Sequence, residues 1–155
     1  ALIKLGLVPY GHILDMTADM PTLTFNTIGR HQSMMVDTRI SSVQSPWLAD
    51  SAVGEIYTVP ISHGEGRFVA SDAVVEQLIQ NGQIATQYVD KTGRPTMEMP
   101  YNPNGSVCAV EGILSPDGRV FGKMAHNERI RKGVAINIAG RTDHDIFRAG
   151  VRYFK

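Results

Sequence analysis

Two apolar runs separated by a strong turn constrain this sequence more than any other feature. Residues 107–114 and 120–124 are strand-like, and Pro116-Asp117-Gly118 between them is typical of a tight turn. The two runs therefore predict an antiparallel β-hairpin. Its second strand leads almost directly to His126, and Glu128 follows two residues later.

The spacing of His126 and Glu128 suits a catalytic base and its partner. In an extended or turn segment, side chains at i and i+2 can point the same way, so Glu128 can reach the imidazole. A carboxylate there fixes the tautomer of the ring and stabilises the imidazolium that forms when the ring takes a proton. The pair would be the base half of a nucleophilic site. The alternative is a surface histidine and glutamate that merely follow a hairpin.

The nucleophile half of such a site is not evident in the sequence. Cys108 is the only cysteine, and it lies inside the predicted strand 107–114. It lacks the sharp turn or helix N-terminus that activates a thiol. We therefore expect Cys108 to be a small buried strand residue and reject it as the nucleophile.

Composition limits the classes of function. The chain has 155 residues, 43% of them hydrophobic, which is enough for one domain with a core. Fifteen basic and fifteen acidic residues give zero net charge, so nothing favours a nucleic acid or an anionic membrane as partner. A single cysteine fits a reducing cytoplasm, and no apolar run reaches the roughly 20 residues that span a bilayer. The five histidines lack short-spaced pairs, so we expect no metal site.

Local patterns predict several further elements. Ser71 or Asp72 can cap a helix that Asn81-Gly82 ends. A terminal helix is expected from Asp145 onward, packed back on the domain. Alternation and β-branched residues favour strands over residues 33–43, 55–61 and 84–89.

The first nine residues read as the tail of an amphipathic helix, with Gly6 near its end. No cap residue precedes them, so we expect the chain to be a fragment of a longer polypeptide. We treat residues 1–155 as one partial domain. Such a fragment would expose sheet edge and apolar surface, and it could survive by forming a homo-oligomer.

The run Gly122 to Arg129 resembles the motif that ends class I glutamine amidotransferases, in which histidine is followed by proline, glutamate and arginine. Asn127 stands where the family usually has proline or a small residue. More closely, nearly the whole chain resembles the glutaminase domains of phosphoribosylformylglycinamidine synthases. The supporting segments occur in the family's order: residues 26–30, 45–47, 60–68, 102–106 and 118–129.

The resemblance implies the C-terminal part of a flavodoxin-like α/β fold, with a mixed, mostly parallel sheet and an antiparallel hairpin. It also implies a Cys-His-Glu triad in which His126 and Glu128 are catalytic. The family's cysteine sits on an elbow just upstream of the equivalent of Ala1, so the N-terminal strands and this elbow would be missing. The chain alone is therefore expected to be inactive.

The resemblance further implies an enzyme, a glutamine-hydrolysing carbon–nitrogen ligase of the cytoplasm. Glutamine would yield ammonia for a synthetase domain or subunit, which uses ATP and magnesium to convert formylglycinamide ribonucleotide to its amidine in purine biosynthesis. No cofactor is expected in these residues themselves. By analogy, Asn26, Arg30, His63, Gly64 and Glu65 would line or support the glutamine pocket.

Three alternatives stay open at this point. The chain could serve another synthetase as a different class I glutamine amidotransferase. It could be a non-catalytic interaction module that kept the fold and lost the chemistry. It could also be a hydrolase of the same fold that acts on other γ-glutamyl or peptide bonds.

Overall fold

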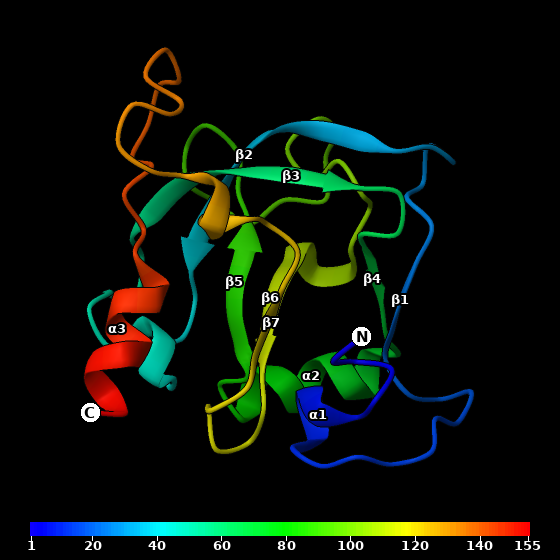
Figure 1. The fold of residues 1–155 in the computed structure, drawn as a ribbon. Helices are drawn as coiled ribbons and strands as arrows, with labels where there is room; N and C mark the ends of the chain where they lie inside the picture. Colours follow the sequence, from blue (N-terminus) through cyan, green and yellow to red (C-terminus); the bar gives the residue numbers. More distant parts are fainter.

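The computed structural model describes all of residues 1–155, and its strands form two sheets (Figure 1). The strands are β1 (Thr22–Thr24), β2 (Gln32–Ile40), β3 (Ile56–His63), β4 (Arg67–Val69), β5 (Ile84–Tyr88), β6 (Val110–Leu114) and β7 (Phe121–Lys123). The helices are α1 (Leu7–Tyr10), α2 (Asp72–Gln80) and α3 (Ile146–Tyr153), with 3-10 turns η1 (Pro46–Leu48), η2 (Val107–Ala109) and η3 (Asn127–Arg129).

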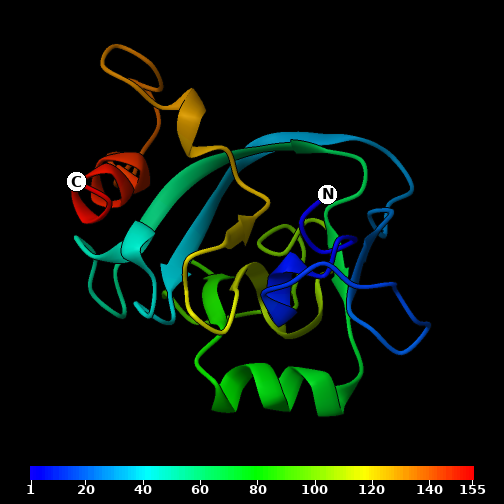
Figure 2. The same cartoon turned by 60° about the horizontal axis from the view of Figure 1, so that its bottom comes forward.

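The larger sheet has the strand order β3-β2-β5-β6-β7, and the smaller one pairs β1 with β4. The predicted hairpin is confirmed, because β6 and β7 pair antiparallel with Gly112 opposite Lys123. Figure 2 shows β2 and β3 as a curved ribbon that arches over the shorter strands. The backbone N–H of His126, just after the hairpin, donates to the carbonyl of Pro60, so the hairpin ends beside β3, the strand whose last residue is His63.

The expectation of a mostly parallel sheet is wrong for these residues, because every strand pair is antiparallel. A parallel pair needs a crossover of about a dozen residues, usually a helix, between two strands of one sheet. Here α2 connects β4 of the small sheet with β5 of the large one. No β-α-β unit therefore forms within a single sheet.

The two longer helices begin where their caps predict. The hydroxyl of Ser71 accepts a hydrogen bond from the Val74 N–H at the start of α2. Asn81 then ends this helix, and Gly82 follows with a φ of +65°. At α3, the carboxylate of Asp145 accepts a hydrogen bond from the Arg148 N–H. The terminal helix packs on η1, where Gly150 leaves room for the ring of Trp47.

Two expectations about local structure need correction. The first residues form a single helical turn that closes at Gly6 (φ +78°), and α1 after it is interrupted by the extended backbone of Val8. The 107–114 run begins as the turn η2, so the strand starts only at Val110. Cys108 is therefore a half-buried turn residue with a φ of +52°, not a buried strand residue. Hydrophobic alternation cannot reveal such a turn, because both conformations hide apolar side chains.

The core is divided into two clusters that meet at Met124. One contains 12 buried residues, among them Tyr57, Ala125 and Ile146, and connects the large sheet to α3. The other contains 7 and fills the space between β6, α2 and the N-terminal turn. Met124 packs against both clusters, so the segment that carries His126 starts where the two clusters meet. None of the helices is long and apolar enough to cross a bilayer.

Candidate active site

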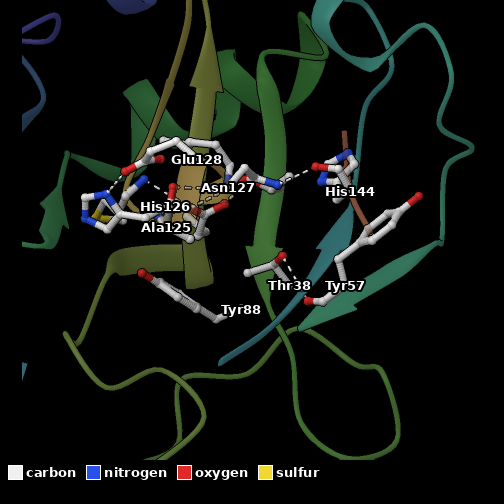
Figure 3. Close-up of polar contacts among 12 residues, drawn as sticks. Thr38, Tyr57, Tyr88, Ala125, His126, Asn127, Glu128 and His144 are labelled. Carbon is white, nitrogen blue, oxygen red and sulfur yellow. Dashed lines mark hydrogen bonds and ion pairs between the residues drawn. The ribbon is translucent and has the colours of Figure 1, made fainter. Parts of the chain in front are cut away.

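A tight turn at the end of the hairpin presents His126 and Glu128 on the same side. The His126 N–H donates to the carbonyl of Pro60 in β3 at 2.8 Å, and the chain then enters η3. His126 Nδ1 lies 2.6 Å from Glu128 Oε1 (Figure 3). The predicted contact between the two side chains is therefore present. It places a carboxylate on one ring nitrogen and leaves Nε2 available.

The electrostatics of the turn favour an ionised Glu128. Partial burial acts to raise the pKa of Glu128, but a hydrogen bond from its own backbone N–H and the contact with His126 outweigh it and lower the pKa. The Arg129 guanidinium, 3.9 Å away, acts in the same direction. Nδ1–H of the neutral ring then donates to the carboxylate, and Nε2 carries the lone pair that can accept a proton.

An adjoining pocket gives the ring access to a reactant. The His126 side chain is 28% exposed and borders a pocket of about 310 Å³. Aromatic side chains of Trp47, Phe121 and Phe147 form much of its wall. A proton acceptor at the edge of a largely apolar pocket is the arrangement expected of a general base.

Sequence reasoning missed a buried ion pair beneath this turn. Glu111 in β6 is 1% exposed, and its Oε1 lies 3.3 Å from Nζ of Lys123. Complete burial acts to raise the pKa of Glu111, but the charge of Lys123 and hydrogen bonds from Thr86 and Ala125 lower it. The available signal was a single acid in the apolar run 107–114 and a single base in the apolar run 120–124.

Asn26 holds the loop that follows β3. Its side-chain amide donates to the carbonyls of His63 at 2.8 Å and Arg30 at 3.0 Å, and its Oδ1 accepts the Gly66 N–H at 2.9 Å. These contacts use the side chain fully, and Asn26 is 2% exposed. The buried Asn26 side chain thus holds the loop after β3 in place through these hydrogen bonds. Contact with glutamine stays a prediction for this residue.

His63 is the last residue of β3 and stands at the start of the same loop. Its Nε2 accepts a hydrogen bond from Asn104 Nδ2 at 2.7 Å, and its ring packs so closely on Gly66 that a Cβ there would lie 2.0 Å from Nε2. Burial lowers the pKa of His63, and the nearby charge of His126 contributes in the same direction. The structure therefore brings the 102–106 turn and the His63 loop to the neighbourhood of His126.

The remaining residues predicted to line the pocket make fewer contacts with the rest of the protein. Gly64 accepts the Asn26 N–H through its carbonyl at 2.9 Å, and Glu65 is exposed. Arg30 is also exposed and makes no ion pair. A role of these residues in binding glutamine stays a prediction.

Cys108 makes no hydrogen bond to His126. Its Sγ lies 3.7 Å from Gln87 Nε2, and its carbonyl accepts a hydrogen bond from the same amide. No group of three or more histidine, cysteine, aspartate or glutamate side chains is arranged to hold a metal ion.

Comparison with known proteins places this geometry in a family. Residues 1–154 match the CobB/CobQ-like glutamine amidotransferase domain. Phosphoribosylformylglycinamidine synthase subunit PurQ of Thermomicrobium roseum is 40% identical over 91 residues, covering 59% of this chain and 38% of that protein. The subunit PurQ of Aquifex aeolicus is 30% identical over 133 residues, covering 86% and 53%.

A solved structure agrees with these relatives. The structure of PurLQS from Thermotoga maritima superposes with a TM-score of 0.68 at 27% identity, covering 99% of this chain and 57% of that one. The chain spans about half the length of the curated relatives that it matches. With residues 1–154 matched and the histidine–glutamate turn in place, the chain belongs to the CobB/CobQ-like glutamine amidotransferase family.

Proposed function

We propose that residues 1–155 form the histidine–glutamate part of the glutaminase of a phosphoribosylformylglycinamidine synthase. The observation that carries the proposal is the 2.6 Å contact between His126 Nδ1 and Glu128 Oε1, which leaves Nε2 available beside a pocket. The names of the PurQ relatives support the synthase, and the description of the matched family supports glutamine as the nitrogen donor. In this reading the protein is a cytoplasmic enzyme, a glutamine-hydrolysing carbon–nitrogen ligase.

The proposed reaction needs a cysteine thiol outside residues 1–155. Nε2 of His126 takes the proton of that thiol, and the thiolate attacks the side-chain carbonyl carbon of glutamine. The imidazolium then gives its proton to the departing nitrogen, which releases ammonia and leaves a γ-glutamyl thioester. Next, His126 takes a proton from water while the hydroxide attacks the thioester carbonyl carbon. The carbon–sulfur bond breaks, glutamate leaves, and the imidazolium returns its proton to the thiolate.

Glu128 acts in this scheme by holding the ring and balancing its charge. Its carboxylate keeps the proton on Nδ1, so that Nε2 faces the reactants in both halves of the cycle. It also stabilises the imidazolium that forms twice. The ammonia would pass to a synthetase domain or subunit, and ATP and Mg²⁺ enter the proposal as cofactors of that part.

The loops around His63 complete the proposed glutamine site. Asn26 fixes the carbonyls of His63 and Arg30, so it supports the loop whose Gly64 and Glu65 would border the substrate. Loops held on a rigid scaffold are where binding groups are usually found. We propose that Asn26 and His63 shape the pocket, while Arg30 lies at its exposed rim.

The test is to supply the intact enzyme with either glutamine or ammonia. The His126→Ala variant should lose about 10²- to 10⁴-fold of its glutamine-dependent synthesis, because it lacks the general base. Ammonia-dependent synthesis should persist, since it bypasses the glutaminase. The proposal fails if both activities fall together, which would make His126 structural, or if glutamine use is unchanged.

A further inference from the structure

We propose that the largely buried pair Glu111–Lys123 is a positioning device for His126, fixing the backbone before the imidazole and the side chain of the residue after it. The pair does not touch the ring itself, so both members are positioning residues and not catalytic ones. The kinetic consequences of this inference rest on the proposed glutaminase function. Its structural consequence, the orientation of the His126 ring, does not.

Glu111 fixes the backbone before His126. Its Oε1 accepts hydrogen bonds from the Ala125 N–H at 2.7 Å and the Met124 N–H at 3.0 Å. Its Oε2 accepts a hydrogen bond from the Thr86 hydroxyl in β5 at 2.5 Å. One carboxylate thus connects a neighbouring strand to the two residues that lead into His126.

Lys123 holds the side chain of Asn127, the residue that follows His126. Its Nζ donates to Oδ1 of Asn127 at 2.7 Å and lies 3.4 Å from the carbonyl of Ala125. The Asn127 side chain is held in turn by its hydrogen bond to the His144 carbonyl at 2.9 Å (Figure 3). The ammonium therefore joins Glu111 to the residue that follows His126.

Stability alone does not explain a charge pair at this place. Replacing a buried ion pair by apolar side chains of similar volume is often neutral or stabilising, because desolvation opposes the attraction between the charges. All five residues of β6 are buried, and Glu111 is the only charged one among them. What apolar side chains could not supply is a set of directional hydrogen bonds on both sides of one imidazole.

Small errors in the orientation of a catalytic base are costly. A displacement of about 1 Å can lower turnover about 10²-fold while leaving the binding contacts in place. A loosened His126 turn should therefore reduce kcat for glutamine and leave KM nearly unchanged. A general loss of structure would instead affect glutamine use, ammonia use and stability together.

The test replaces both charges at once, so that neither is left buried alone. In the intact enzyme, Glu111→Gln combined with Lys123→Met should lower kcat for glutamine about 10- to 100-fold. KM for glutamine and ammonia-dependent synthesis should stay within about twofold. The control is Gln83→Met, which removes a buried amide that donates to the carbonyls of Pro9 and Leu114. It should lower stability and leave kcat unchanged.

A second readout separates this inference from the proposed function. In the 155-residue chain, ¹⁵N NMR of the His126 ring should show one set of signals for the wild type and for Gln83→Met. The double variant should show two sets or broadened signals. Unchanged ring signals, or an unchanged kcat in an enzyme that hydrolyses glutamine, would overturn the positioning role. Altered ring signals in a protein without glutaminase activity would uphold the positioning role and reject the proposed function.

Discussion

His126 and His144 lie on either side of Asn127 and have opposite surroundings (Figure 3). His126 contacts a carboxylate and borders a pocket. His144 is 7% exposed, and its ring is stacked on Tyr57 with the centroids 4.0 Å apart. Burial first, and then the charge of Lys123, lowers the pKa of His144 to about 4.

The comparison shows how neighbours decide what an imidazole can do. A carboxylate partner fixes the tautomer of a ring and balances the charge that forms when the ring takes a proton. A ring buried against an aromatic face and near a cation stays neutral and serves as packing. The same residue type thus has a carboxylate partner beside a pocket on one side of Asn127 and forms a core contact on the other.

The largest expected effect on stability comes from acid. Above pH 6.5, His144 is neutral in both the folded and the unfolded chain. As the pH falls from 6.5 to about 4, the unfolded chain binds a proton on His144 that the folded chain does not bind. The free energy of unfolding should therefore fall by up to about 3 kcal/mol over this range.

Denaturant unfolding at several pH values measures this loss. His144→Phe keeps the stacking on Tyr57 and has no proton to bind, so its free energy of unfolding should depend less on pH between 6.5 and 4. Glutamine-dependent turnover of this variant should stay close to that of the wild type. If the variant and the wild type lose the same free energy of unfolding in acid, His144 is not the group responsible for the loss.

The next effect concerns the carboxylate that sets His126 apart. Glu128→Gln removes the charge that balances the imidazolium, and an amide can favour the wrong tautomer. Because Glu128 is 55% exposed and water replaces part of its effect, we expect turnover with glutamine to fall about 10- to 100-fold. Steady-state assays with glutamine and with ammonia would measure it. An equal loss of turnover with glutamine and with ammonia would contradict the proposed role of Glu128 in orienting His126.

The smallest effect tests the surroundings of His144. Tyr57→Phe removes the hydroxyl that donates to Glu55 Oε2 at 2.8 Å and keeps the ring that covers His144. Thermal unfolding should report a loss of about 1 kcal/mol. The pH dependence assigned to His144 should persist. If it disappeared, the hydroxyl and not the stacked ring would be what keeps His144 neutral.

Local signals predicted much of the fold. Ser71 and Asp145 marked the starts of α2 and α3, and the turn at residues 116–118 marked the β6–β7 hairpin. The contact between His126 and Glu128 also followed from spacing, because it depends only on the local shape of one turn. Each of these features is determined by residues close together in the chain.

Features that depend on distant pairing escaped prediction. The direction of the strands depends on α2 joining two different sheets, which no local pattern reveals. Glu111 and Lys123 read as ordinary strand residues until the hairpin brings them together under His126. Likewise, Asn26 can hold the loop after β3 only because His63, 37 residues later in the chain, lies beside it.

The most direct measurement of the central claim is the tautomer of His126 in the wild-type chain, read by ¹⁵N NMR at a pH where the ring is neutral. We expect a proton on Nδ1, donated to Glu128, and an unprotonated Nε2 on the ring that borders the pocket. This preference should be lost in Glu128→Gln. A proton on Nε2 in the wild type, or a tautomer that does not respond to Glu128, would show that Glu128 does not orient His126 as a base.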